Sequence, residues 1–250
     1  MANFPPLKNY LIYCLDKLID DYQLSYPFLD VGCGAGDVSS HLALKGWQGE
    51  AIDLSDQAIE DAKSNLALFN NIKVVKSSLF EVNGKFKTVF LLDVLEHIND
   101  DRAALTKIAS LLAINGFLVI SLPSNPREWR WDDDFYGHYR RYSLEGIKEK
   151  LILAGLKPLI FWDFTYPVFC FIRRLYTKLK SFENKTIEQD KLKRSIASSA
   201  VNAWDIPLCS KFLSRESFFW SFIYRLQFKF FRDKVKNGHE MLVLAQKSTE

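Results

Sequence analysis

Short apolar runs alternate with amphipathic stretches along most of the chain. The runs that predict buried strands lie at residues 27–32, 49–55, 72–78, 87–94, 117–123, 156–164 and 239–247. Between them apolar residues recur at helical spacing, and residues 7–21 add an amphipathic helix ahead of the first strand. Strands that alternate with helices form parallel sheets covered on both faces. The pattern therefore predicts an α/β fold with a doubly wound, mainly parallel sheet.

Polar residues mark where several of the predicted helices begin. Ser55 and Ser143 each precede a helical stretch and are good N-caps. Asn99 is placed to cap a further helix that extends through Leu112. Residues 124–142 show no such pattern and are predicted as a loop.

The overall composition is that of a folded chain of ordinary polarity. Its 250 residues are 48% hydrophobic and 25% charged, with a net charge of +3. The four cysteines are far apart and form no CxxC pair or Cys/His cluster, which argues against a zinc site or a disulfide framework and fits a reducing compartment. No signal-peptide pattern opens the chain, and no apolar run reaches the ~18 residues of a spanning helix. We therefore expect a cytoplasmic protein.

One segment, residues 167–238, differs from the rest in charge and aromatic content. It holds 15 Lys/Arg against 6 Asp/Glu, whereas the remainder holds 18 against 24. It also contains 14 of the 36 aromatic residues. Within it, the polar stretch 183–199 is predicted to be a linker or surface loop. The segment is therefore expected to have a role of its own.

The same segment contains a helical pattern with an apolar face and a basic stripe. Apolar residues recur at Phe219, Phe222, Ile223, Leu226 and Phe230, and basic residues at Arg225, Lys229, Arg232 and Lys236. Such a helix suits an anionic membrane surface, which would make the protein peripheral to the membrane. The alternative is a helical cap whose aromatic residues pack on the sheet and whose charges are solvated. Nucleic acid is disfavoured as a partner, because the apolar face is too continuous.

A glycine-rich turn follows the first predicted strand, in the stretch FLDVGCGAGDVSS at residues 28–40. Its glycines are Gly32, Gly34 and Gly36, and the next residue is Asp37. The third glycine of the dinucleotide-binding motif is missing, and a carboxylate at the start of the following helix repels a pyrophosphate. An uncharged or cationic adenosine ligand fits better, with Asp53 placed to accept hydrogen bonds from a ribose diol.

Three further stretches accompany this turn. The set is FLDVGCGAGDVS (28–39), EAIDLS (50–55), LLDVLEHIND (91–100) and GFLVISLP (116–123). Together they resemble the class I S-adenosylmethionine-dependent methyltransferases over about residues 25–165 and the terminal strand. The resemblance implies a Rossmann-like seven-stranded sheet with an antiparallel last strand and an inserted helical cap. The cofactor-binding domain would comprise residues 1–166 and 239–250, with residues 167–238 as the insert.

The resemblance implies S-adenosylmethionine as the cofactor and indicates which residues would contact it. Asp30 would lie near the ammonium group, Asp53 would hold the ribose hydroxyls, and Leu54 would pack on the adenine. Ser78 stands where many relatives have an acidic residue that accepts from the adenine amino group. The full set of expected cofactor contacts is Asp30, Gly32, Cys33, Gly34, Gly36, Asp53, Leu54, Ser78, Leu79, Asp93 and Val94.

The stretch DDDFYGHYRRYS, residues 132–143, follows the fifth predicted strand, where substrate lids of this fold lie. His138 is the candidate general base, because histidine is the side chain that changes its charge near neutral pH. Arg141, together with Arg140, could clamp a carboxylate or a phosphate. The alternative is that His138 and Arg141 only fasten the lid to acids of the core.

Asp93, Glu96 and His97 form a D-x-x-E-H pattern. It is similar to the E-x-x-E-H that binds a divalent metal in ubiquinone-type O-methyltransferases and in small-RNA 2′-O-methyltransferases, and His138 could be a further ligand. An aspartate replaces the first glutamate, however, and the EH pair is widespread in relatives without a metal. No metal is therefore favoured.

These observations favour an enzyme that O-methylates a small-molecule acceptor or one linked to a lipid or a glycan. One alternative is a catalytically silent cofactor-binding module that associates with a membrane or a partner protein. Another is an RNA methyltransferase. The sequence does not identify the acceptor.

Overall fold

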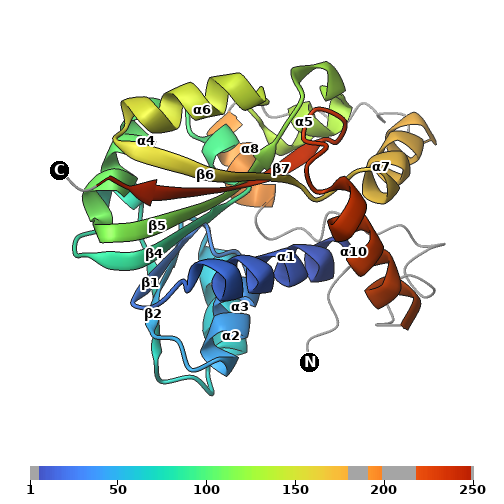
Figure 1. Cartoon of the computed structure of the whole chain (residues 1–250). Helices are drawn as coiled ribbons and strands as arrows, with labels where there is room; N and C mark the ends of the chain where they lie inside the picture. The colour runs from blue at the N-terminus through green and yellow to red at the C-terminus, as the bar shows by residue number, and fades with distance from the viewer. Residues whose placement is uncertain (1–5, 180–190, 199–217, 249–250) are drawn as a thin grey trace.

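A seven-stranded sheet forms the middle of the molecule, with helices on both of its faces (Figure 1). The computed structural model describes residues 6–179, 191–198 and 218–248. The strands are β1 (Phe28–Val31), β2 (Gly49–Asp53), β3 (Ile72–Lys76), β4 (Phe86–Leu92), β5 (Leu112–Pro123), β6 (Leu156–Asp163) and β7 (Glu240–Lys247). Their order is β3-β2-β1-β4-β5-β7-β6, and β7 runs antiparallel to both β5 and β6. The predicted doubly wound sheet with an antiparallel last strand is confirmed.

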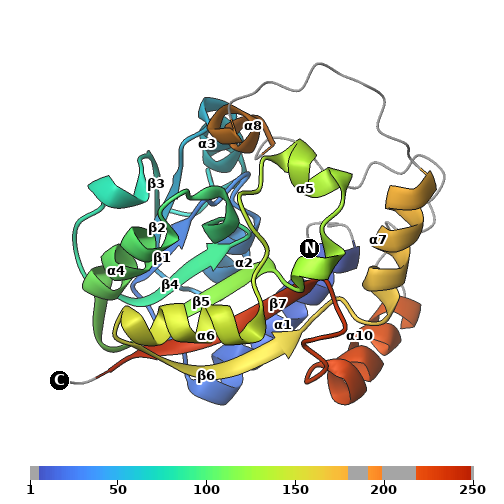
Figure 2. The same ribbon diagram turned by 90° about the horizontal axis from the view of Figure 1, so that it is seen from above.

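The helices cover the two faces of the sheet in separate groups, seen side-on in Figure 1 and from above in Figure 2. One face carries α1 (Pro6–Tyr22), α2 (Asp37–Leu44) and α3 (Asp56–Asn65), and the other carries α4 (Asp101–Leu111) and α6 (Leu144–Leu153). Consecutive residues of β4 belong to opposite cores, because successive side chains of a strand point to opposite faces. Phe90 packs on the α1 side, and Val89 and Leu91 pack on the α4 side. This arrangement explains why the strands are continuous apolar runs.

Most of the predicted helix starts are confirmed, and one is wrong. The hydroxyls of Ser55 and Ser143 accept from the N–H groups of Ala58 and Gly146. Asp100, and not Asn99, caps α4, since its carboxylate accepts from the N–H of Ala103 at 3.0 Å.

The end of α4 and the segment after β5 also differ from the prediction. Helix α4 ends at Leu111, because Leu112 is already extended and pairs with Phe86 of β4. The predicted loop 124–142 contains the short 3₁₀ helix η3 (Pro126–Glu128) and the helix α5 (Trp131–Tyr136).

The described part of the predicted insert contains three helices. They are α7 (Val168–Leu179), α8 (Lys191–Ser198) and α10 (Phe218–Phe231), and residues 232–238 form turns. The rings of Tyr10 on α1 and Tyr224 on α10 stack with centroids 5.2 Å apart, so α10 shares the core of the α1 face. No helix within the described residues is both long and apolar enough to cross a membrane.

Helix α8 contradicts the prediction that residues 183–199 form a linker or surface loop. The ammonium group of Lys191 donates to the carbonyl of His138 at 2.9 Å, and Arg194 donates to the carbonyl of Asp134. These contacts dock α8 on the segment that contains α5. They join residues far apart in the sequence, so the polar composition of residues 183–199 did not indicate them. Residues 183–190 and 199 lie outside the described part of the chain.

Candidate functional site

The glycine-rich turn lies at the carboxyl end of β1, next to the end of β2. Gly32, Gly34 and Gly36 all have positive φ angles, of 71°, 53° and 79°. The N–H groups of Gly32 and Cys33 both donate to the carbonyl of Ile52, at 2.8 and 3.0 Å. A Cβ atom on Gly32 would lie 2.4 Å from Cγ2 of Val94. The turn therefore requires glycine at position 32 for both conformation and space.

Asp53 ends β2 and holds the glycine-rich turn from the other side. Its two carboxylate oxygens accept from the N–H groups of Gly34 and Ser55, at 3.0 and 2.9 Å. These bonds fix the orientation of a buried carboxylate beside the glycines, and each oxygen retains capacity to accept a further hydrogen bond. This geometry fits the expected contact with a ribose diol.

Asp30 lies one strand away from Asp53 and is also buried. Its carboxylate accepts from the hydroxyl of Ser39 at 2.6 Å. Burial, with the charge of Asp53 as a smaller contribution, raises the pKa of Asp30 to about 6. A cationic group placed beside Asp30 would relieve this cost, so the site suits the ammonium group of the expected cofactor.

The residues expected around the adenine are divided between surface and core. Leu54 is 43% exposed just beyond β2, as a side chain that packs on a ligand would be. Leu79 is buried in the core. The hydroxyl of Ser78 caps the 3₁₀ helix η1 (Leu79–Glu81) by accepting from the N–H of Phe80 at 3.3 Å. The thiol of Cys33 is half-buried, and burial raises its pKa.

Lys8 is a further candidate site residue, which the sequence pattern did not indicate. It lies on α1, and its ammonium group forms an ion pair with Asp37, at the start of the helix after the glycines. Partial burial lowers the pKa of Lys8, against the attraction of Asp30 and Asp93. A basic group therefore lies among the carboxylates near the glycine-rich turn. No local pattern distinguishes Lys8 from Lys17, the other lysine of α1.

The next part of the site follows β4. Asp93 has a positive φ of 54°, and its carboxylate accepts from the hydroxyl of Ser121 at 2.7 Å. Glu96 and His97 belong to the 3₁₀ helix η2 (Leu95–His97). Glu96 is buried, and burial together with the charge of Asp93 raises its pKa well above the usual range.

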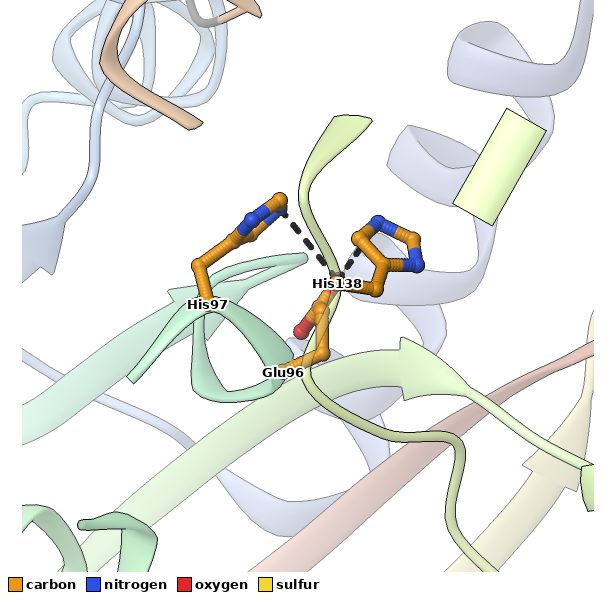
Figure 3. A group of neighbouring side chains, drawn as sticks. All are labelled: Glu96, His97 and His138. Atoms are coloured by element: carbon orange, nitrogen blue, oxygen red, sulfur yellow. Dashed lines mark ion pairs between the residues drawn. The ribbon is translucent and has the colours of Figure 1, made fainter. Parts of the chain in front are cut away.

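Glu96 lies between two histidines, as Figure 3 shows. Its Oε1 is 4.0 Å from Nε2 of His97 and 4.0 Å from Nε2 of His138. Among the described residues, Oε2 of Glu96 and Nδ1 of His97 are buried without a hydrogen-bond partner. Burial, with a smaller effect of His138, lowers the pKa of His97 to about 3, so this ring is neutral.

These three side chains, and not Asp93, form the group that could hold a metal ion. The ligand atoms of Glu96, His97 and His138 all lie within 4.8 Å of one another. The D-x-x-E-H pattern had placed Asp93 in this set, but its carboxylate is directed to Ser121. A carboxylate with two imidazoles is a chemically suitable donor set for a divalent cation.

The lid segment is fastened through one buried carboxylate, Asp133 on α5. It accepts from Nδ1 of His138 at 2.9 Å, Nε of Arg141 at 2.8 Å and Nη2 of Arg173 at 3.0 Å. Although burial opposes ionisation, the hydrogen bond from His138 and the charge of Arg141 hold the pKa of Asp133 well below its usual range. An ionised Asp133 can only accept, so Nδ1 of His138 carries the hydrogen and Nε2 is left available when the ring is neutral.

The two candidate arginines of the lid are both engaged with the protein. Arg141 is buried and also donates to the carbonyls of Ser124 and His239, each at 2.8 Å. Arg140 pairs with Asp101 at 2.8 Å. The structure therefore favours the fastening role for Arg141 over a clamp on the substrate.

Arg173 and Glu240 also lie close to Asp133 and Asp93, and the sequence pattern indicated neither of them as a site residue. Arg173 comes from α7 of the insert and also pairs with Asp132 at 2.7 Å. Glu240 begins β7, and because β7 is antiparallel this end lies beside the carboxyl ends of the parallel strands. Burial and the charge of Asp93 raise the pKa of Glu240 to about 8. The part of the site around η2 and the start of β7, which we call the acceptor side because the proposal below places the methyl acceptor there, is thus rich in carboxyl groups.

The sheet order, the glycine-rich turn and the two carboxylates beside it define a class I S-adenosylmethionine-dependent methyltransferase. A family model described as "Methyltransferase domain" matches residues 13–159, which is more than half of the chain. The chain belongs to this family.

Two named relatives come from bacteria. A ubiquinone biosynthesis O-methyltransferase of Rickettsia bellii is 28% identical over 200 residues, which are 78% of this chain and 75% of that protein. A protein of the same name from Xanthomonas euvesicatoria is 36% identical over 98 residues. That match spans 37% of this chain and about two fifths (41%) of the Xanthomonas protein.

Solved structures agree on the fold. A putative sarcosine dimethylglycine methyltransferase from Galdieria sulphuraria aligns with a TM-score of 0.62 at 17% identity, covering 97% of this chain and 86% of that chain. A magnesium protoporphyrin IX methyltransferase from Synechocystis, crystallised with S-adenosylhomocysteine, aligns with a TM-score of 0.56 at 16% identity, covering 97% of this chain and 83% of that chain. At these identities the likeness concerns the fold alone.

Proposed function

We propose that the protein transfers a methyl group to a hydroxyl of a small-molecule acceptor or of one linked to a lipid or a glycan. The Asp133–His138 pair is the observation that carries this proposal. Its 2.9 Å hydrogen bond orients the ring and leaves Nε2 available, next to η2 and the end of β4. This is the arrangement of a general base held by a carboxylate.

The charges around the acceptor side support a neutral hydroxyl as the reacting group. Glu96, Glu240 and Asp93 surround it, while Arg140 and Arg141 are occupied by ion pairs with the protein. An acceptor held through a carboxylate or phosphate would find neither of these guanidinium groups free to clamp it. The names of the two bacterial relatives, both O-methyltransferases, support the same class of reaction.

S-adenosylmethionine, when bound, supplies a methyl group that is already activated on a sulfonium. Asp30 would hold its ammonium group, Asp53 its ribose hydroxyls, and Lys8 its carboxylate. Most of the catalysis then comes from holding the acceptor oxygen in line with the methyl group. His138 would take the proton from the acceptor hydroxyl at Nε2 as the new oxygen–carbon bond forms, and the sulfur–methyl bond would break to leave a neutral thioether as the leaving group. Asp133 stabilises the imidazolium that results.

The experiment is a labelled-methyl transfer assay on separate lipid-extract, glycan, small-molecule and RNA pools. We expect label in the lipid, glycan or small-molecule pools, as an ether that survives mild base. We also expect its loss in the His138→Gln variant but not in a His41→Gln control. His41 is a histidine of α2 that pairs with Asp16 at 2.7 Å, away from the lid.

Label confined to RNA would contradict the proposal. Cofactor binding without transfer to any pool would instead support a silent binding module.

A further inference from the structure

The outer sides of α7 and α10 expose a set of large apolar side chains. These are Phe171, Leu175 and Leu179 on α7 and Phe219, Phe222, Leu226 and Phe230 on α10, with exposed fractions from 43% to 74%. The two helices touch through stacked rings of Phe169 and Trp220, whose centroids are 5.9 Å apart. Figures 1 and 2 both place them at the same end of the molecule. We call these seven side chains the outer apolar face.

Packing of the insert on the sheet does not account for this face. Helix α10 has a separate buried side, on which Trp220, Tyr224 and Phe228 join the core around α1 and β6. Phe228 meets Trp162 edge to face with centroids 4.9 Å apart. Phe222 and Phe230 lie outside this core and are 57% and 56% exposed, so packing among the described residues does not remove them from water.

The charges beside the outer apolar face have one sign. Helices α7 and α10 contain five Lys/Arg and no Asp/Glu, and two of the five, Arg173 and Arg174, pair with carboxylates of the protein. Lys178, Arg225 and Lys229 are exposed at its border. The ammonium group of Lys229 lies over the ring of Phe230, 5.3 Å from its centroid. Aromatic and aliphatic side chains bordered by exposed cations are typical of helices that lie in the headgroup region of anionic membranes.

The connections of α7 and α10 place this face beside the site. Helix α7 follows the carboxyl end of β6, and α10 precedes the start of β7 at the same edge of the sheet. The glycine-rich turn and η2 also lie at this edge, after β1 and β4. A surface that held α7 and α10 would therefore meet the molecule at its substrate-binding end.

We propose that the outer apolar face binds the surface of a membrane rich in anionic lipids. The phenylalanines and leucines insert among the lipid headgroups, and Lys178, Arg225 and Lys229 contact lipid phosphates. The enzyme then works with its acceptor site next to the membrane.

Flotation of the full chain with vesicles tests this proposal, without a methyl donor or acceptor. Vesicles of phosphatidylcholine with ~30% phosphatidylglycerol are compared with vesicles of pure phosphatidylcholine at low and high salt. We expect binding to the anionic vesicles that weakens with salt, and little binding to the neutral ones. Because no transfer is measured, a failure here leaves the proposed reaction untouched, and a failure of the transfer assay leaves this result untouched.

Two double variants locate the contact. Phe222→Ser with Phe230→Ser should weaken binding by roughly tenfold or more, since each buried phenylalanine contributes substantially. The control, Leu68→Ser with Ile114→Ser, removes side chains that are 92% and 70% exposed elsewhere and should bind like the unaltered chain.

A charge-reversal variant, Arg225→Glu with Lys229→Glu, keeps the apolar residues and should lose the preference for anionic vesicles. The proposal is overturned if the chain floats with neither vesicle, or if both double variants of α10 bind as the unaltered chain does. It is also overturned if the phenylalanine variant abolishes a concentration-dependent dimer while vesicle binding persists, because the face would then be covered by a second copy.

Discussion

Replacing Asp133 by asparagine should weaken the contacts of this residue with His138 and Arg141 of the lid and with Arg173 of the insert. The unaltered carboxylate receives side-chain donors from His138, Arg141 and Arg173, and its side chain is 0% exposed. Asparagine keeps the shape and one acceptor oxygen but removes the charge. The guanidinium groups of Arg141 and Arg173, with 2% and 6% side-chain exposure, would remain buried next to a neutral group.

The expected loss follows from the burial of these partners. Removing one member of a buried ion pair costs roughly 3–5 kcal/mol, because the remaining charge is left uncompensated. For a chain of this size that corresponds to a drop in Tm of about 6–20 °C. Arg173 keeps its pair with Asp132, which puts the expected value at the lower end of the range.

The pH dependence of stability gives a second signature of Asp133. Its pKa is held low in the folded protein, so its contribution is present above the ordinary aspartate pKa and is lost as the pH falls below it. The unaltered protein should therefore lose stability on acidification from about pH 5 to pH 2 more steeply than the Asp133→Asn variant.

Thermal and urea unfolding at several pH values provide the measurement, and Asp134→Asn is the matched control. Asp134 is the next residue of α5 and is exposed, so the same substitution should cost at most about 1 kcal/mol there. Methyl transfer should fall in Asp133→Asn and not in Asp134→Asn. Equal stabilities for the two variants would refute the idea that one carboxylate fastens the lid.

Four further predictions concern the cofactor and the base. Burial raises the pKa of Asp30 to about 6, and only its ionised form attracts an ammonium group. The affinity for S-adenosylmethionine, measured by calorimetry, should therefore fall about tenfold per pH unit below pH 6. The Asp30→Asn variant should not show this pH dependence. Gly32→Ala should lower the free energy of unfolding by about 1–2 kcal/mol because of its positive φ, and by about 1–3 kcal/mol more because of the 2.4 Å contact with Val94. Gly46 has a φ of 79° but open space around it, so Gly46→Ala should show only the first loss and bind the cofactor normally. Lys8→Met should weaken cofactor binding about tenfold or more, because a charge-assisted hydrogen bond contributes roughly 1.5–3 kcal/mol. His138→Gln should lower kcat by about 10²–10⁴ with the cofactor Kd unchanged, and chelation should leave the unaltered enzyme active.

Each of these has a result that would count against it. A cofactor affinity that stays flat from pH 5 to pH 8 would remove the role of Asp30. Equal unfolding free energies for Gly32→Ala and Gly46→Ala would mean that the turn relaxes away from Val94. Unchanged binding in Lys8→Met would leave the lysine as a partner of Asp37 only. If a chelator abolished activity and added Mg²⁺ restored it, His138 would be better explained as a metal ligand beside Glu96.

Features that depend on neighbouring residues could be predicted from the sequence. The strands, the glycines at 32, 34 and 36, and the cap at Ser55 are set by local conformation and short-range hydrogen bonds. Even the error at Asn99 is of this kind, because Asp100 is an adjacent residue of equal capping ability.

Features that depend on distant partners could not be predicted. Arg141 has the same sequence surroundings whether it faces a substrate or Asp133, and the fold alone decides between them. Asp133 is one of three consecutive aspartates, and only the turn of α5 and the approach of α7 distinguish it. Lys8 lies near the glycine-rich turn because α1 packs on the sheet. The spacing of residues along the sequence does not indicate this packing.

The position of β7 between β5 and β6 also affects how the chain can fold as it is made. During synthesis β5 and β6 emerge before β7, and in the folded sheet each of them pairs with β7 and not with the other. Until Met241 to Ala245 arrive, both strands present unpaired, strongly apolar edges. Such edges recruit other strands readily. The nascent protein should thus be most vulnerable to aggregation just before its final strand is available, and a chain cut short before β7 should stay in that condition.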